Sequence, residues 1–350
     1  MKAIVYRKPN DFVIEEINLP VLESDEVLIR ITASGICTND MRDFRGESNY
    51  TFPRIGGHEY CGVIEDSGKG VDKTRFKKGS RVVSYIIEDC KECYYCKHGM
   101  ENLCEEFPKS RIFFNPEGMS GYGGFAEYIK VKSNDICFYP DNTPFEKMVL
   151  TEPLACVINS INAANIKLGD DVLVIGGGTM GLLHVMAAKL RGARVILSEP
   201  LKERCEKALE LGCSEAFSPL ECDPVQRVKD LTSGRGVNVV FNTTAIPSVA
   251  EQSVEMTAVG GICLLFSSIH PNRPLAVDGG AIHSYQKTVT GTVSPTLESF
   301  QQAVELIAKD ILDPSVLIED IFDYEEFDLA MKNATRPDTF KVVLKFGDLK

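Results

Sequence analysis

The sequence lacks the features of three large classes of protein. No apolar run approaches the roughly 20 residues that a transmembrane helix requires. The opening residues, MKAIVYRKPNDFVIEE, have no apolar core of a signal peptide. No block of Lys or Arg is present, and a formal net charge of −12 would repel nucleic acid and anionic membranes. We therefore expect a cytoplasmic protein that binds neither nucleic acid nor a membrane.

Cysteine, by contrast, is abundant. The chain has 12 cysteines among 350 residues, and 44% of its residues are hydrophobic and 25% charged. This composition is typical of a soluble globular protein, and the length is enough for two or three domains. Because thiols stay reduced in the cytosol, so many cysteines favour metal binding or catalysis over disulfides.

Four of the cysteines lie in the stretch DCKECYYCKHGMENLC, residues 89–104: Cys90, Cys93, Cys96 and Cys104. This spacing lets one loop surround an ion, and four thiolates in a tetrahedral shell are typical of a closed, structural Zn²⁺ site. The alternatives are an iron–sulfur cluster or four unligated thiols. We predict a zinc lobe at about residues 89–105. His98 is expected on its surface, because four thiolates already fill the shell.

A second group of candidate ligands is spread along the chain. GICTND contains Cys37 and Asp40, GGHEYCG contains His58 and Glu59, and LTEPLAC contains Glu152. One Cys, one His and one carboxylate leave a tetrahedral position open, as a catalytic zinc requires. Taken singly, a histidine beside glycine is more often a turn residue and a lone cysteine is more often core filler. Asp40 is a candidate partner for the ligating imidazole, or alternatively a helix cap.

The clearest unit is LGDDVLVIGGGTMGLLHVMAAKLRGARVILSEP, residues 168–200. A buried strand over Val172–Ile175 leads into a glycine-rich turn and an apolar helix over Met180–Leu190. A second strand, Arg194–Ser198, ends at Glu199. The turn has the pattern G-x-G-x-x-G. Its glycines are Gly176, Gly178 and Gly181, and its variable positions are Gly177, Thr179 and Met180. The pattern between a strand and a helix, followed by an acidic residue, predicts a dinucleotide-binding site.

The physical roles in this unit follow from its backbone and charge. The glycines allow a tight turn and a close approach to a pyrophosphate, and the helix N-terminus offers N–H groups and a favourable dipole. Glu199 can accept hydrogen bonds from ribose hydroxyls and would repel a ribose phosphate, so NAD is favoured over NADP. Arg204 reaches the adenosine side or lies on an exposed helix surface, and both interpretations remain open.

The alternation of strands and helices continues beyond this unit. Strands are predicted at Val237–Phe241, Gly261–Phe266 and Thr288–Gly291, with a helix over Val249–Thr257, which makes a doubly wound parallel sheet up to about residue 290. Residues before about 150 contain many short strands broken by Gly and Pro, typical of a small β-rich, barrel-like domain. After a helix over Leu297–Lys309, FKVVLKF at 340–346 is expected to return to that first domain. A cleft between the domains would bring zinc and nicotinamide together.

Together these features resemble the zinc-containing medium-chain alcohol dehydrogenase family, and within it the polyol (sorbitol-type) branch. The resemblance covers essentially the whole chain. It rests on Cys37 with Asp40, Gly57-His58-Glu59, the four-cysteine lobe, GGFAEY at 123–128, EPL at 152–154 and the glycine motif. It implies a GroES-like catalytic domain over residues 1–153, a Rossmann NAD-binding domain over 154–290 and a return of 291–350 to the catalytic domain. It also implies two zinc ions per chain, NAD as cofactor and a homodimer or homotetramer.

The resemblance also assigns roles to the second ligand group. Its catalytic zinc ligands map to Cys37, His58 and a third residue, which is Glu152 in the polyol branch. Glu59 is a direct ligand in some members and supports the ligands in others, so the third ligand stays open between the two glutamates. The usual Ser or Thr of the proton relay is replaced by Asn39, which cannot lose a proton. Thr38, or water through Glu59, is expected to take its place.

The implied reaction is oxidation of a secondary hydroxyl on a polyol or sugar acid, with hydride transfer to NAD. Threonine-type amino-alcohol oxidation is the nearest alternative, because those relatives share the zinc pattern. Zinc-free quinone reductases and structural relatives are disfavoured by the intact Cys37, His58 and Glu152, and a zinc-ribbon nucleic-acid binder is disfavoured by the net charge. Five aromatic residues are candidates for either the substrate pocket or the core: Phe44, Tyr50, Phe52, Phe113 and Phe114.

Overall fold

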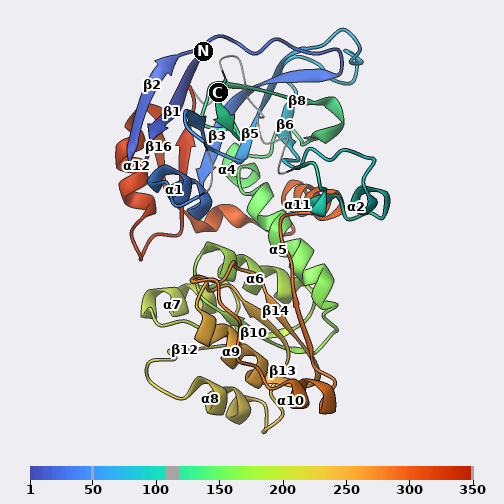
Figure 1. Ribbon diagram of the computed structural model, residues 1–350, viewed down its shortest axis with the longest axis vertical. Coiled ribbons are helices and arrows are strands. Elements are labelled where there is room, and N and C mark those ends of the chain that lie inside the picture. The colour runs from blue at the N-terminus through green and yellow to red at the C-terminus, as the bar shows by residue number, and fades with distance from the viewer. Residues whose placement is uncertain (49–50, 108–117, 348–350) are drawn as a thin grey trace. The chain divides into compact units, whose positions relative to one another are not determined.

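The chain folds into two compact units (Figure 1), a first unit of residues 1–155 and 296–350 and a second unit of residues 156–295. The computed structural model describes residues 1–48, 51–107 and 118–347. Three of the candidate pocket aromatics, Tyr50, Phe113 and Phe114, lie outside the described residues. Each unit has its own sheets and its own buried side chains.

The first unit is built on two β-sheets. The larger sheet has the strand order β16-β17-β3-β5-β6-β9, with β8 paired to β3. Its strands are β3 (Glu26–Ile36), β5 (Glu59–Ser67), β6 (Arg81–Ser84), β8 (Tyr128–Lys132), β9 (Ile136–Phe138), β16 (Ile318–Asp323) and β17 (Lys341–Lys345). The smaller sheet has the order β2-β1-β4-β7 and consists of β1 (Lys2–Lys8), β2 (Asp11–Glu16), β4 (Arg54–Ile55) and β7 (Ser120–Gly121). The β-rich first domain predicted from the sequence is confirmed.

The last strand of the chain joins the larger sheet. β17 pairs antiparallel with β3, with Val342 opposite Ile36 and Leu344 opposite Ser34, and it runs parallel to β16. The apolar side chains of β17 are almost fully buried, as expected for a strand covered on both faces. β17 is therefore part of the larger sheet of the first unit. This pairing places Lys341 beside the end of β3.

The helices of the first unit are mostly short. They are α1 (Thr38–Arg45), α2 (Tyr94–Lys97), α4 (Phe145–Met148), α11 (Leu297–Ala308) and α12 (Phe327–Ala334), with 3₁₀ turns η1 (Glu101–Leu103), η2 (Ser133–Asp135), η3 (Pro314–Leu317) and η4 (Tyr324–Glu326). Another helix, α5 (Thr151–Ala164), continues from the first unit into the second. Phe44 on α1 packs against Tyr6 and Phe327, with ring centroids 5.3 and 6.3 Å apart. Phe44 is therefore part of an aromatic cluster with Tyr6 and Phe327, and Phe44 and Phe52 are both half-buried.

The second unit contains one sheet of six parallel strands in the order β12-β11-β10-β13-β14-β15. The strands are β10 (Asp171–Ile175), β11 (Arg194–Ser198), β12 (Glu215–Phe217), β13 (Val237–Asn242), β14 (Thr257–Leu265) and β15 (Thr288–Gly291). The helices are α6 (Thr179–Leu190), α7 (Lys202–Glu210), α8 (Pro224–Leu231), α9 (Pro247–Met256) and α10 (Gly279–Ser284). The sheet core is fully buried, for example at Leu173, Ile196 and Val240, so the predicted doubly wound α/β fold is confirmed. No helix in the described parts of either unit is both long and apolar enough to cross a membrane.

One predicted strand boundary in this sheet differs from the structure by more than one residue. β14 begins at Thr257, four residues before the predicted start at Gly261. Gly260 has a φ of 72°, and the register between β13 and β14 shifts between Val237 and Val239. The glycine pair therefore marks an irregularity inside a longer strand, and not the turn before a shorter one.

Candidate metal centres and dinucleotide cradle

The four cysteines of the predicted lobe converge on one point. Their Sγ atoms all lie within 4.8 Å of one another. Cys93 and Cys96 lie at α2, Cys104 follows η1, and Lys91 has a left-handed φ of 62° that turns the chain after Cys90. The Sγ–Sγ distances are 3.4 Å for Cys93–Cys96 and 3.9 Å for Cys90–Cys96. Four thiolates at about 2.3 Å from a tetrahedral Zn²⁺ would be about 3.8 Å apart, so this donor set fits zinc.

Backbone N–H groups already point at these sulfur atoms. Cys90 Sγ accepts hydrogen bonds from the N–H groups of Glu92 at 3.4 Å and Cys93 at 3.2 Å, and Cys104 Sγ accepts from the N–H of Cys90 at 3.3 Å. Hydrogen bonds from the backbone of Cys96 and Glu105 lower the pKa of the Cys93 thiol to about 6. Donors of this kind stabilise negative sulfur at Cys90, Cys93 and Cys104, whereas burial and the neighbouring thiols raise the pKa of Cys96.

His98 stays outside the thiol cluster. Its ring is exposed and stacks on Tyr94, with centroids 4.1 Å apart, so the predicted surface position is confirmed. The lobe is tied to the start of α11 by Glu101, whose Oε1 accepts a hydrogen bond from the backbone N–H of Leu297 at 2.6 Å. The lobe is therefore a closed cluster, formed by its own loop and anchored to a neighbouring helix.

The second cluster brings together residues from separate elements. Cys37 is the N-cap of α1, and His58 and Glu59 lie at the start of β5. The ligand atoms of these three residues lie within 4.8 Å of one another. His58 is 7% and Glu59 1% exposed. A thiolate, an imidazole and a carboxylate form the donor set of an open zinc site, so the residues present fit the ion that the sequence predicts.

Asp40 connects the parts of this cluster, which we name the Cys37–His58–Glu59 site. Asp40 Oδ2 accepts the N–H of Cys37 at 3.0 Å, and Oδ1 accepts the N–H of Gly57 at 2.9 Å. His58 Nδ1 is buried 3.5 Å from Asp40 Oδ1 and has no closer hydrogen-bond partner among the described residues. Asp40 is the third residue of α1. It thus closes the first turn from within the helix, and also lies beside the imidazole that it was expected to orient.

Lys341 belongs to this site and was missed by the sequence analysis. Its Nζ donates to Glu59 Oε1 at 2.8 Å, to Glu59 Oε2 at 2.6 Å and to the carbonyl of Ile36 at 3.2 Å. The Lys341 and Glu59 side chains are 5% and 1% exposed. Lysine is almost never buried unless it is paired. The sequence gives no sign of this pair, because the partners are 282 positions apart.

Negative charge exceeds positive charge in the Cys37–His58–Glu59 site. Burial opposes the charged form of His58, but Asp40 and Cys37 hold its pKa well above the usual range. Burial also opposes the charged form of Lys341, yet Glu59, Cys37 and Glu152 raise its pKa. Two basic groups, Lys341 and His58, thus share the site with three carboxylates, Asp40, Glu59 and Glu152, and with the Cys37 thiol. A bound cation would balance the remaining charge.

Two further residues predicted for this site lie at its edge. Glu152 is 9% exposed in the first turn of α5 and is near enough to raise the pKa of Lys341. Its carboxylate is not among the three ligand atoms that lie within 4.8 Å of one another. Thr38 is the first residue of α1 and is exposed.

The glycine motif lies where β10 passes into α6. Gly176 has a φ of 98°, and a Cβ there would lie 2.7 Å from Thr243 Oγ1. A Cβ at Gly181 would lie 1.8 Å from the carbonyl oxygen of Gly176, so only glycine lets the helix pack on the loop. Gly178 is the N-cap of α6, and a Cβ there would have no neighbour nearer than Arg204 Nη1 at 3.5 Å. The approach to the helix N-terminus is therefore open, as a pyrophosphate requires.

The surroundings of the cradle are polar and fixed. Thr179 and Met180 begin α6, whose N-terminus has no side-chain cap. Glu199 is 3% exposed, and its two oxygens accept the N–H groups of Gly177 at 2.5 Å and Leu201 at 2.9 Å. Arg204 is half-buried on α7, with its guanidinium beside Gly178. The carboxylate and the guanidinium therefore both lie at the glycine loop, where a dinucleotide would be held.

Two family models match the chain. They are "Alcohol dehydrogenase GroES-like domain" over residues 23–141 and "Zinc-binding dehydrogenase" over residues 179–309. The sorbitol dehydrogenase of Bacillus subtilis is 30% identical over 340 residues, which cover 95% of this chain and 93% of that relative. The L-threonine 3-dehydrogenase of Pyrococcus horikoshii is 34% identical over 280 residues, which cover 78% of this chain and 77% of that relative.

Solved structures have the same fold over the full length. A Sinorhizobium meliloti 1021 protein of the zinc-binding dehydrogenase type, bound to NADP, is 25% identical with a TM-score of 0.90. An Escherichia coli CFT073 protein described as a short chain alcohol dehydrogenase (rspB), in complex with NADH, is 26% identical with a TM-score of 0.88. Each match covers 99% of both chains. The chain is therefore an enzyme of the zinc-containing medium-chain alcohol dehydrogenase family, and it is similar to members of the polyol branch.

Proposed function

We propose that this enzyme oxidises a secondary hydroxyl of a polyol or sugar acid to a ketone and transfers the hydride to NAD. The observation that carries the proposal is the Cys37–His58–Glu59 site, where Cys37, His58 and one carboxylate would leave a tetrahedral position for a substrate oxygen. The similarity to a sorbitol dehydrogenase along 95% of the chain supports the choice of a polyol.

When bound, Zn²⁺ would supply Lewis-acid stabilisation of the substrate oxygen, and NAD would accept the hydride. Cys37 and His58 would hold the ion, and Asp40 would fix the imidazole through its Nδ1 side. The hydroxyl proton would leave through Thr38, which is exposed next to Cys37, or through Glu59 and water. The side-chain amide of Asn39 cannot lose a proton, so Asn39 would take no part in the proton relay.

The Lys341 contact favours Glu152 over Glu59 as the third ligand. Both Glu59 oxygens already accept hydrogen bonds from the Lys341 ammonium, which draws electron density away from a metal. Glu59 would then act beside the ion, as a fixed carboxylate that receives a proton or a water molecule. Under this proposal, Glu152→Ala releases the catalytic zinc, whereas Glu59→Gln keeps the zinc and slows turnover. Zinc content by elemental analysis separates the two variants.

We infer a preference for NAD over NADP from the position of Glu199. Its carboxylate is fixed by two backbone N–H groups, and a ribose phosphate nearby would be repelled. The guanidinium of Arg204 would bind the pyrophosphate or the adenosine. Because one similar structure contains NADP and another contains NADH, the ratio of kcat/KM for the two cofactors is the quantity to measure. Glu199→Ser should shift that ratio towards NADP by about tenfold or more.

L-Threonine is the second candidate substrate, because an L-threonine 3-dehydrogenase is 34% identical over 78% of the chain. The deciding experiment measures NAD reduction by zinc-loaded enzyme on hexitols, pentitols, sugar acids, L-threonine and simple alcohols, with Cys37→Ser as the background. Turnover confined to polyols or sugar acids supports the proposal, and turnover on L-threonine alone assigns the enzyme to amino alcohols. Activity on none of them would contradict both. Light scattering on the same preparation tests the expected homodimer or homotetramer.

A further inference from the structure

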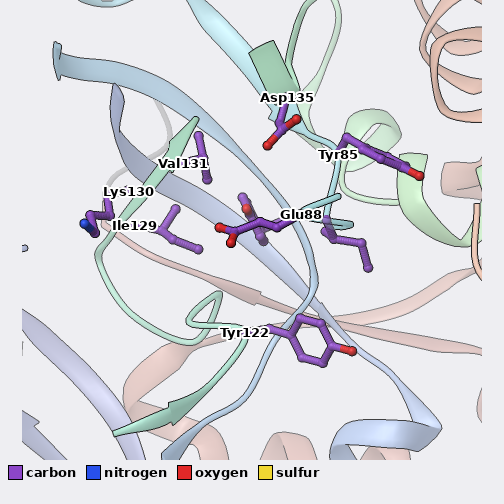
Figure 2. Close-up of a pocket in the computed structure, with 9 residues that line it drawn as sticks. Tyr85, Glu88, Tyr122, Ile129, Lys130, Val131 and Asp135 are labelled. Atoms are coloured by element: carbon purple, nitrogen blue, oxygen red, sulfur yellow. The ribbon is translucent and has the colours of Figure 1, made fainter. Parts of the chain in front are cut away.

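A small pocket in the first unit is lined by two carboxylates, three tyrosines and side chains of β8 (Figure 2). Its cavity measures about 20 Å³, which is room for a single ion or water molecule. Glu88 comes from the segment between β6 and Cys90, and Asp135 is the last residue of η2. Figure 2 shows the Glu88 side chain across the middle of the pocket, with the Asp135 carboxylate directed towards it.

Asp135 is buried without a partner for its charge. The residue is only 8% exposed. Its backbone carbonyl accepts the N–H of Tyr85 at 2.8 Å, but no hydrogen bond or ion pair from the described residues reaches its carboxylate. Burial, with a contribution from Glu88, raises the pKa of Asp135 to about 7. A carboxylate in this position is costly when ionised, unless a cation lies next to it.

The nearby lysines are engaged elsewhere. Lys130 Nζ lies 2.9 Å from Glu26 Oε2, and Figure 2 shows its ammonium turned away from the two carboxylates. Lys91 Nζ lies 2.6 Å from Asp89 Oδ1. Lys132, on β8, is exposed. These charges moderate the field in the pocket, but none of them makes a direct contact with Glu88 or Asp135 in the described residues.

We propose that Asp135 and Glu88 bind a hard divalent cation in this pocket, with Ca²⁺ as the best match. The donors available are oxygens, which hard cations prefer, and two carboxylates balance a double positive charge. Ca²⁺ accepts irregular geometry, whereas Mg²⁺ requires a nearly ideal octahedron. The ion would join the segment that enters the zinc lobe to η2. This site is separate from both cysteine-containing clusters and does not depend on the proposed reaction.

The test uses full-length, zinc-loaded protein with Tb³⁺ as a luminescent substitute for Ca²⁺. The chain has no tryptophan, and Tyr60, Tyr85 and Tyr122 line the pocket. Tyrosine excitation should therefore sensitise an ion that is bound there. We expect saturable Tb³⁺ emission that Ca²⁺ displaces. We also expect CaCl₂ to raise the Tm more than NaCl at equal ionic strength, because a ligand of the folded state stabilises it.

Two variants and a matched control decide the assignment. Asp135→Asn and Glu88→Gln should each weaken Tb³⁺ binding by about tenfold or more, whereas Asp141→Asn, which removes an exposed carboxylate, should leave it unchanged. Glu88 is half-buried, so its variant remains informative if Asp135→Asn does not fold. The site is overturned if wild-type protein gives no saturable emission, or if the Glu88 and Asp135 variants bind Tb³⁺ as well as the wild type does.

Discussion

The two cysteine-containing clusters of the first unit are built in opposite ways. The lobe takes its four thiols from residues 90–104, and backbone N–H groups of the same loop point at the sulfurs. The Cys37–His58–Glu59 site is formed by the N-cap of α1, the start of β5 and, through Lys341, the last strand. The lobe therefore forms from local chain geometry, whereas the other site exists only when the larger sheet is assembled.

The two clusters also differ in how their charges are stabilised. In the lobe, negative sulfur is stabilised by backbone dipoles close to solvent, because three of the four cysteines are only half-buried. In the Cys37–His58–Glu59 site, buried side chains of opposite charge face one another directly. A closed site of the first kind suits stability, and an open, highly charged site of the second kind suits chemistry.

The largest effect that we expect is the loss of activity when a ligand of the Cys37–His58–Glu59 site is replaced. Cys37→Ser should lower kcat/KM by about a thousandfold, because a hydroxyl is a poor zinc ligand and the Lewis acid is lost. Zinc should fall from two ions to one per chain. NAD binding, measured by fluorescence titration, should stay nearly unchanged, since the glycine motif lies in the second unit. Near-normal turnover by this variant would remove the basis of the proposed reaction.

The next largest effect concerns the charge balance of the Cys37–His58–Glu59 site. Lys341→Met leaves the buried Glu59 without its partner and should destabilise the protein by about 3–5 kcal/mol, as measured by urea unfolding. Combining it with Glu59→Gln should restore much of that stability, because the uncompensated charge is then gone. Lys341→Arg serves as the matched control that keeps the charge. Equal stability of Lys341→Met and the wild type would mean that the pair does not contribute to folding.

The sequence predicts residues that are close along the chain better than residues that meet only in the fold. Cys90, Cys93, Cys96 and Cys104 are close along the chain, so their spacing alone predicted the lobe. The strand–glycine–helix unit was found for the same reason, since β10, Gly176 and α6 are consecutive. Lys341 was not found, because its pairing with Glu59 depends on the register of β17 against β3, which no local pattern encodes.

The Asp135–Glu88 pocket escaped the sequence analysis for a related reason. Neither residue belongs to a recognisable motif, and each taken alone looks like an ordinary surface carboxylate. They meet because η2 follows β8, and because the segment after β6 runs past it towards the zinc lobe. A buried charge becomes visible only when the residues around it are known.

A third change tests whether the lobe is an independent stabilising element. Cys104→Ser should release the lobe zinc and lower the free energy of unfolding by about 2 kcal/mol or more, because metal binding and local folding are coupled. Limited proteolysis should then cut within residues 89–105. The zinc held by Cys37 and His58 should remain, so the residual activity per folded molecule should exceed that of Cys37→Ser. Loss of both ions from Cys104→Ser would show that the two clusters are not independent.

The smallest expected effect comes from His98, the histidine on the surface of the lobe, and His58 provides the contrast. His58 is buried beside Asp40, whereas His98 is exposed and stacks on Tyr94. His98→Ala should keep two zinc ions per chain and change the stability by about 0.5 kcal/mol or less, as expected for a surface substitution. His58→Ala should lose one ion, as Cys37→Ser does. If His98→Ala instead released zinc, the lobe would use a ligand set other than its four thiolates, and the description of it as a closed thiolate site would be wrong.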